Sequence, residues 1–165
     1  LDPTHASIIW RVWHLGYSHF AGRFEAISAT AEVNATKPEA SKVTVTIKPE
    51  SGVTGVAKLD DELKGAMFFD AAKFPTAQFV GDKFTYEGDK LTAVSGNLTI
   101  KGKTQPVTFK ANQFACYDSP MLKREVCGGD FETTIDRTAF GADYGVQYGF
   151  PKNVRIVAQI EAIKQ

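Results

Sequence analysis

The sequence predicts an all-β protein, an eight-stranded antiparallel up-and-down barrel with one or two short helices inserted between the third and fourth strands. Apolar residues recur at every second position in most segments, which is typical of strands with one buried face. One segment departs from this period, because Leu59, Leu63 and Met67 recur at helical spacing. An eight-stranded meander interrupted once closes most economically into a barrel, whose centre holds packed side chains or one small ligand.

The first two strands are expected at residues 6–14 and at about 22–33. In the first, the inward phase carries Ala6, Ile8, Trp10, Val12 and His14. Its outward phase includes Ile9 and Trp13, so both faces carry aromatic or large apolar side chains. In the second, Phe20 and Phe24 fall in one phase and the apolar residues from Ile27 onward in the other, which a β-bulge near Glu25 or Ala26 would reconcile.

Six further strands follow the same period, at about residues 43–47, 77–84, 94–100, 107–111, 126–135 and 154–162. Pro49 ends the third strand because proline cannot donate to the ladder. Gly88 and Asp89 form the turn between the fourth and fifth strands. Small residues in the inward phase, such as Gly96 and Ala158, favour a concave interior. The helical segment is expected to end before Pro75.

Composition favours one domain over residues 1–165 and excludes several partners. Nineteen basic and 19 acidic residues leave a net charge of zero, so no field draws the chain to nucleic acid. No apolar run approaches the roughly 18 residues of a membrane span, and we expect no integral membrane segment. Because the chain starts at Leu1 without an initiator methionine or a basic and apolar leader, we expect that an upstream signal segment has been removed.

Cys116 and Cys127 are predicted to form a disulfide. They lie near the ends of the sixth and seventh strands, which should pair antiparallel, and the segment between them holds the turn-forming residues Asp118, Ser119 and Pro120. An even number of cysteines fits a disulfide in an oxidising compartment, and it fits two buried thiols in the cytosol equally well. The alternative to a disulfide is therefore that both cysteines are buried free thiols, which behave as small apolar residues.

Several segments resemble the YceI-like family in order and spacing. They are HASIIWRVWHLGYSHFAGRF at residues 5–24, the stretch 63–79 with Phe-Phe-Asp and Ala-Lys-Phe-Pro, Gly96 to Gly102, Thr104 to Val107, and Arg137, Phe140, Gly141 and Tyr144. The resemblance covers most of the chain, and the cysteine hairpin at 116–129 departs from the simplest members. It implies a lipocalin-like barrel, a periplasmic or secreted location, and binding of polyisoprenoids, quinones or amphiphilic fatty molecules, with no required cofactor.

Aromatic residues make up 12% of the chain, more than a barrel of this size needs to fill its centre. We predict that they line an apolar tunnel, although a solid aromatic core would give the same composition. The expected wall consists of Trp10, Phe20, Phe24, Phe68, Phe79, Phe109, Phe131, Phe140 and Tyr144. His14, Tyr17 and His19 cluster at the end of the first strand, and we expect at least one of them to contact the polar end of a ligand.

Catalysis and metal binding find little support in the sequence. Ser18 and His19 are adjacent, which points their side chains apart, and no Gly-x-Ser-x-Gly element occurs. His5 and His14 fall in opposite strand phases without a Cys-x-x-Cys or Glu-x-x-His element, so we expect no metal site.

The predicted function is therefore the non-enzymatic binding, storage or transport of a long-chain isoprenoid lipid of the polyprenyl or quinone type. Two alternatives remain. One is a structural module with a packed core and a homodimer interface at Ile9 and Trp13, and the other is a binder of fatty acids or fatty amides. The outer side chains of the first strand are the feature that favours a structural module. An apolar interior alone does not distinguish isoprenoid ligands from fatty ligands.

Overall fold

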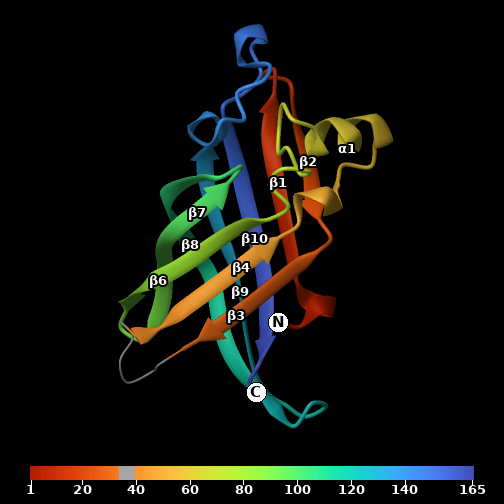
Figure 1. The fold of residues 1–165 in the computed structure, drawn as a ribbon. Coiled ribbons are helices and arrows are strands. Elements are labelled where there is room, and N and C mark those ends of the chain that lie inside the picture. Colours follow the sequence, from red (N-terminus) through yellow and green to blue (C-terminus); the bar gives the residue numbers. More distant parts are fainter. Residues whose placement is uncertain (34–39) are drawn as a thin grey trace.

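The computed structural model describes residues 1–33 and 40–165, which form one curled antiparallel sheet (Figure 1). Its strands are β1 (Ser7–His14), β2 (Ser18–Phe24), β3 (Ile27–Glu32), β4 (Lys42–Ile47), β5 (Gly52–Val53), β6 (Ala77–Glu87), β7 (Lys90–Ile100), β8 (Lys103–Ser119), β9 (Arg124–Asp136) and β10 (Asn153–Ile163). The helical elements are α1 (Ala57–Lys64) and the short 3-10 helices η1 (Pro3–His5), η3 (Pro49–Ser51), η4 (Arg137–Phe140) and η5 (Val146–Tyr148).

The strand order confirms the all-β class and the antiparallel meander. Across the sheet it runs β3, β4, β6, β7, β8, β9, β10, β1, β2 and β5. From β6 to β10 each strand pairs with its successor in the chain, and β10 then pairs with β1, with Ala158 opposite Ile8. The last long strand therefore returns to the first, as an up-and-down arrangement requires.

Two features of the predicted barrel are wrong. The sheet has ten strands instead of eight, and it is a curled open sheet with β3 and β5 at its edges. The cause is a bend between β2 and β3, where the sequence suggested only a bulge. Within the bend, Glu25 N donates to Ser51 O at 3.2 Å and Ala26 N to Ser51 Oγ at 2.9 Å. These hydrogen bonds take the place of strand-to-strand hydrogen bonds. As a result, β2 and β3 lie on opposite sides of the gap between the two edges of the sheet.

The inserted helical segment contains one α-helix, α1, packed beside β5 and η3 near the open side of the sheet (Figure 1). Asp60 anchors its first turn, because its Oδ1 accepts from Thr54 N and from Thr54 Oγ1, both at 2.6 Å. Leu59 and Leu63 share the helical stripe as expected. Met67 lies beyond the helix end in a series of turns, and it is 59% exposed.

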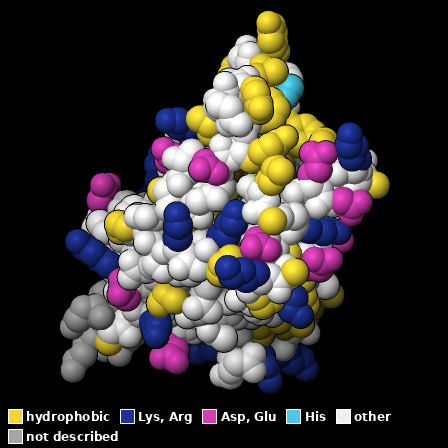
Figure 2. Space-filling view, turned by 45° about the horizontal axis from the view of Figure 1, so that its top comes forward, with side chains coloured by type: hydrophobic (Ala, Val, Ile, Leu, Met, Phe, Trp, Pro, Cys, Tyr) yellow, Lys and Arg dark blue, Asp and Glu magenta, His cyan; other side chains and the backbone are white. Residues whose placement is uncertain are grey.

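The buried core lies mainly on β6, β7, β8 and β9. It consists of Phe79, Leu91, Val94, Leu98, Phe109, Ala111, Ile135 and Phe140. Lys and Arg side chains alternate with Asp and Glu over the body of the molecule, whereas apolar side chains gather at one end (Figure 2). All of these core residues except Ala111 also border the open space that the concave face of the sheet encloses.

Candidate functional site

A cavity of about 630 Å³ lies within the curl of the sheet. Residues of β1, β2, β4, β6, β7, β8, β9 and β10 form its wall, and Leu59, Leu63, Phe68 and Phe69 cover the open side. The wall is almost entirely apolar, since inward positions alternate with polar outward positions along each strand. The volume falls in the range of small-molecule sites, roughly 300–1,000 Å³. The predicted hollow interior is present, so the alternative of a solid aromatic core is wrong.

Ten of the twelve predicted ligand-contacting residues lie on this wall. They are Trp10, His14, Phe20, Phe24, Phe68, Phe79, Phe109, Phe131, Phe140 and Tyr144. Three pairs of these rings contact each other around the cavity, Trp10 with Phe20, Phe68 with Tyr144, and Phe79 with Phe109. The ring centroids of Phe79 and Phe109 lie 4.9 Å apart, and those of Trp10 and Phe20 lie 6.0 Å apart. Aromatic rings that pack against one another therefore form part of the cavity wall, and the centre of the cavity stays open.

Tyr17 and His19 do not lie on the wall. Tyr17 is 86% exposed in the turn after β1. His19 pairs with Trp13 across β1 and β2, and the two rings meet edge to face on the outer side of the sheet with centroids 4.5 Å apart. The turn places Tyr17 in solvent, and strand alternation explains the position of His19, because Trp13 and His19 occupy the phase opposite to Val12 and Phe20. Neighbours in sequence at a strand end therefore separate in space.

Several wall residues escaped the sequence prediction. They include Leu59, Leu63, Phe69, Phe84, Phe114 and Phe150. The sequence did contain a signal for Leu59 and Leu63, because an amphipathic helix beside a curled sheet must turn its apolar face inward. No sequence pattern indicated Phe150, because it follows the αL residue Gly149 in an irregular loop. Its ring centroid lies 5.9 Å from that of His14.

Several polar groups of the wall lie at the end of β1, and Thr54, Glu62 and Gln78 lie elsewhere on the wall. His14 and Ser18 are register partners across β1 and β2, and both are exposed. Arg137 reaches the same wall, and its Nε donates to Pro151 O at 2.8 Å while Nη1 donates to Ala142 O. Burial lowers the pKa of Arg137 below its usual value, and the charges of Asp143 and Asp136 oppose this effect.

The wall reaches solvent at several places. Along its sides the exposed wall residues are Ala31, Val33, Glu62 and Gln78. Exposed wall residues at the β1 end are His14, Ser18 and Tyr144, and Tyr86 is exposed near the β6–β7 turn. Between them the wall runs along β10 from Val154 to Ala162, almost the full length of that strand. The geometry is therefore that of an elongated tunnel with a polar rim at the β1 end.

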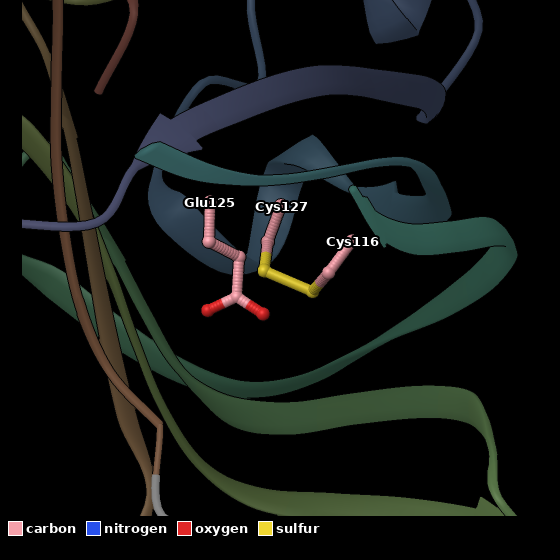
Figure 3. Close-up of side chains that lie close together, drawn as sticks. All are labelled: Cys116, Glu125 and Cys127. Atoms are coloured by element: carbon pink, nitrogen blue, oxygen red, sulfur yellow. A yellow bond between two sulfur atoms is a disulfide. The ribbon is translucent and has the colours of Figure 1, made fainter. Parts of the chain in front are cut away.

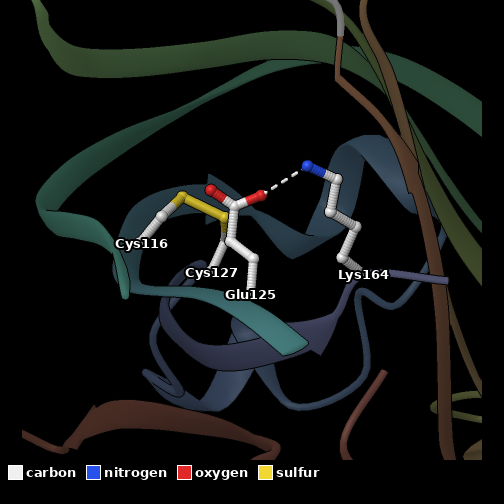
Figure 4. The surroundings of a disulfide bond; sticks show 4 residues. All are labelled: Cys116, Glu125, Cys127 and Lys164. Atoms are coloured by element: carbon white, nitrogen blue, oxygen red, sulfur yellow. Dashed lines mark hydrogen bonds and ion pairs between the residues drawn. A yellow bond between two sulfur atoms is a disulfide. The ribbon is translucent and has the colours of Figure 1, made fainter. Parts of the chain in front are cut away.

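The predicted disulfide between Cys116 and Cys127 is present, and it joins register partners of β8 and β9. Cys127 belongs to the cavity wall. Glu125 lies beside the two sulfur atoms (Figure 3). Its Oε2 accepts from Lys164 Nζ at 2.8 Å (Figure 4). Because both sulfurs are bonded to each other, this cluster cannot offer thiolates to a metal ion.

A second cluster of metal-ligating residue types, Asp2, His5 and Glu161, lies outside the cavity wall. Asp2 Oδ2 is 3.0 Å from His5 Nδ1, and this hydrogen bond, together with those from Thr4, lowers the pKa of Asp2 to about 2. Asp2 Oδ1 accepts from Thr4 N at 2.9 Å, which caps η1. Asp2 N also donates to Glu161 O at 2.8 Å, so these bonds give the cluster a local structural role at the start of β1.

Among the described residues, no helix has both the length and the apolar composition needed to cross a membrane. The fold and the cavity together define a class of protein, in which a single curled β-sheet with a helix over its open side encloses an elongated apolar tunnel. Comparison with known proteins assigns the family. Residues 1–162 match the YceI-like domain, and the chain belongs to the YceI-like family.

Individual relatives agree with this assignment. A UPF0312 protein of Pseudomonas putida is 37% identical over 140 residues, which are 85% of this chain and 72% of the relative. The solved structure of Burkholderia cenocepacia BcnA has a TM-score of 0.79 at 23% identity and covers 98% of this chain and 99% of its own. A polyisoprenoid-binding domain from Saccharophagus degradans has a TM-score of 0.69 at 11% identity, covering 97% and 94%. At these identities the two solved structures establish the common fold.

Proposed function

We propose that the protein binds a long-chain isoprenoid lipid, of the polyprenyl or quinone type, in the tunnel and carries it without chemical change. The observation that carries the proposal is the tunnel itself, about 630 Å³ of space walled by aromatic and aliphatic side chains. Empty apolar space of this size costs packing contacts, so a fold that keeps it open gains most when a ligand fills it. The structural neighbour described as a polyisoprenoid-binding domain supports the same ligand class.

The polar rim suggests how the ligand is oriented. His14, Ser18 and Tyr144 offer hydrogen-bonding groups at the β1 end, whereas the opposite end near Cys127 and Ala162 is apolar. A ligand with one polar end and a long tail fits this distribution when its head lies at the rim and its tail runs along β10. A quinone carbonyl or a terminal hydroxyl would find donors there.

Energetics favour a carrier that exchanges its lipid reversibly. Burying an apolar tail gains about 0.8 kcal/mol per methylene relative to water. The tail leaves a bilayer that is equally apolar, so transfer into the tunnel is nearly neutral, and the head-group contacts set the affinity. Such a protein needs no energy source to load or to release its ligand.

An oxidising compartment, the periplasm or the extracellular space, suits this proposal. The disulfide between Cys116 and Cys127 supports it, because disulfides persist where the cytosolic reducing systems are absent. Quinones and polyprenyl lipids reside in bilayers that border such compartments.

Native mass spectrometry of the purified protein, followed by organic extraction and identification of the released compound, tests the proposal. We expect a mass increment that disappears on extraction and a compound with a repeating five-carbon tail. Protein that carries no apolar compound, and that takes up none when mixed with a polyprenyl quinone in detergent, would contradict it. A straight-chain fatty acid or fatty amide in the extract would instead support the alternative ligand class.

A further inference from the structure

One end of the molecule is built from segments without charged side chains. Residues 12–22, 65–69 and 144–151 contain no Asp, Glu, Lys or Arg, although charged residues make up 23% of the chain. The first segment holds the β1–β2 turn, the second follows α1, and the third contains η5. Three stretches far apart in sequence are therefore all uncharged, which is the composition expected of a surface that leaves water.

The fold brings these segments together. The ring centroids of Phe68 and Tyr144 lie 5.7 Å apart, and those of His14 and Phe150 lie 5.9 Å apart. Leu15 Cδ2 lies 3.7 Å from the position of a Cβ built on Gly149. Figure 2 shows apolar side chains gathered at this end of the molecule. We call this surface the apolar tip, formed by Trp13, Leu15, Tyr17, Met67 and Tyr148.

The side chains of the apolar tip are largely exposed to solvent. Tyr17 is 86% exposed, Tyr148 70% and Met67 59%. Leu15 is 42% exposed and has a φ of 49°, in the left-handed region that leucine rarely adopts. Leu15 and Gly16, at φ 49° and 80°, are the central residues of a turn in which Tyr17 N donates to His14 O at 3.0 Å. A hairpin turn with positive φ at both central residues ordinarily holds Asn or Gly there. A strained backbone that presents a leucine to solvent is the kind of outlier from which a contact function is inferred.

The apolar tip surrounds one opening of the tunnel. His14, Ser18 and Tyr144 belong to the tunnel wall and are exposed next to it. Another opening, near Tyr86, lies beside the charged turn residues Glu87, Asp89 and Lys90. The opening at the β1 end is thus bordered by a surface that an apolar phase would accept.

We propose that the apolar tip inserts into the interfacial layer of a lipid bilayer and sets this opening of the tunnel against the membrane. The inference rests on the proposed function, since a ligand that resides in bilayers needs a route from the membrane into the tunnel. Tyrosine and tryptophan are the side chains enriched at membrane interfaces, and leucine and methionine enter the acyl boundary. Lys101 and Asp143 lie beside Met67, and Lys101 Nζ donates to Ala66 O at 2.7 Å and to Gly141 O at 3.1 Å. None of the five residues of the apolar tip is itself cationic, so the tip fits a neutral bilayer, without a requirement for anionic lipid.

Flotation with phosphatidylcholine vesicles tests the proposal. The wild-type protein is expected to float with the vesicles, and the double variant Leu15→Asn/Tyr17→Ser to lose at least about tenfold in vesicle partitioning, since each removed side chain takes apolar area out of the membrane contact. Asparagine suits the left-handed φ at position 15, so the variant is expected to fold at least as well as the wild type.

The matched control is Met121→Ser/Leu122→Asn. These side chains are 91% and 47% exposed on the β8–β9 hairpin, which lies at the opposite end of the molecule (Figure 1) and carries Lys123 and Arg124. Removing a similar exposed area there is expected to leave flotation unchanged. Lipid carried by each purified variant is measured in parallel by extraction.

The outcomes separate this inference from the proposed function. Wild-type protein that carries an extractable lipid but does not float overturns the inference and leaves the proposed function standing. Equal loss in the tip and control variants, or flotation that requires anionic vesicles and vanishes in salt, also overturns it. A concentration-dependent dimer that the tip variant abolishes, without vesicle binding, would assign the apolar tip to a second copy of the chain. Flotation without any lipid in the tunnel would overturn the proposed function alone.

Discussion

The indole of Trp10 lies against Gly22, its register partner across β1 and β2. A Cβ built on Gly22 would stand 2.3 Å from Cζ2 of Trp10 and 2.6 Å from Cε2, well inside van der Waals contact. Trp10 Nε1 is the one buried side-chain polar atom without a hydrogen-bond partner in the described part of the chain. Packing against a bare backbone, with no hydrogen bond, therefore holds this ring on the tunnel wall.

Replacing Gly22 with alanine is expected to push the indole toward the tunnel centre. Overpacking of this kind costs about 1–3 kcal/mol in the free energy of unfolding. Denaturant unfolding measures the loss, and the near-UV circular dichroism of the tryptophans reports the ring movement. Ala21→Ser, on the exposed outer face of the same strand, is the control and should change neither. An unchanged stability in Gly22→Ala would contradict the contact.

Filling the tunnel is expected to reduce its lipid content without unfolding the sheet. Ala158 lies on the tunnel wall between its register partners Ile8 and Phe131. In Ala158→Phe the ring occupies space that the tail would need, so less lipid should be extracted from the purified protein. The existing void spares the variant most of the cost of overpacking.

The control for the filled tunnel is Ala115→Phe. Ala115 is exposed on β8 and does not belong to the tunnel wall, so this substitution adds the same ring outside. Its lipid content should equal that of the wild type. A filled variant that carries the wild-type amount of lipid would show that the ligand lies elsewhere.

Periodicity predicted most strands because it is a local property of the chain. The last strand was expected at 154–162 and spans Asn153–Ile163, since its alternation follows directly from which face meets the interior. The bend after Phe24 was visible only as a change of phase. Whether such a change is a bulge or a break depends on Ser51, which binds Ala26 N from 25 residues away. No pattern within the strand contains that information.

The site could be predicted to the extent that strand phase determines it. Trp10 and Phe79 reached the wall because inward phase and burial coincide in a curled sheet. Tyr17 and His19 were grouped with His14 by their nearness in sequence, but the turn at Leu15 and Gly16 exposes the first, and strand alternation points the second outward. Phe150 enters the wall from a loop whose path depends on glycines at positive φ.

The disulfide between Cys116 and Cys127 is expected to stabilise the protein by about 3 kcal/mol, less any strain, because it closes a short loop in the unfolded chain. Chemical unfolding of Cys116→Ala/Cys127→Ala should show this loss relative to the oxidised wild type. Fully reduced wild-type protein is the matched control and should be as stable as the variant. Thiol counting on denatured, unreduced protein should find no reactive group, and two per chain would contradict the bridge.

The hydrogen bond between Asp2 and His5 is expected to make the attachment of η1 depend on pH. This bond is the largest cause of both pKa shifts. With the hydrogen bonds from Thr4 it lowers the pKa of Asp2 to about 2, and with the charges of Asp2 and Glu161 it raises the pKa of His5 above its usual value. A raised histidine pKa stabilises the folded form below pH 6.5, and this contribution is lost as the pH rises through the folded-state value. The lowered Asp2 pKa stabilises it above pH 3.8, and this contribution is lost as the pH falls toward about 2.

The attachment of η1 should therefore be strongest between pH 3.8 and 6.5, where both contributions are complete. Amide hydrogen exchange of Thr4, whose N–H donates to Asp2 Oδ1, measures the attachment, and an NMR titration of His5 measures its pKa. Asp2→Asn keeps an acceptor for Thr4 but removes the charge, so the His5 pKa should fall toward its usual value. Both residues are exposed to solvent, so salt should weaken the coupling. A His5 pKa that is the same in the variant and in the wild type would show that the pair does not interact in solution.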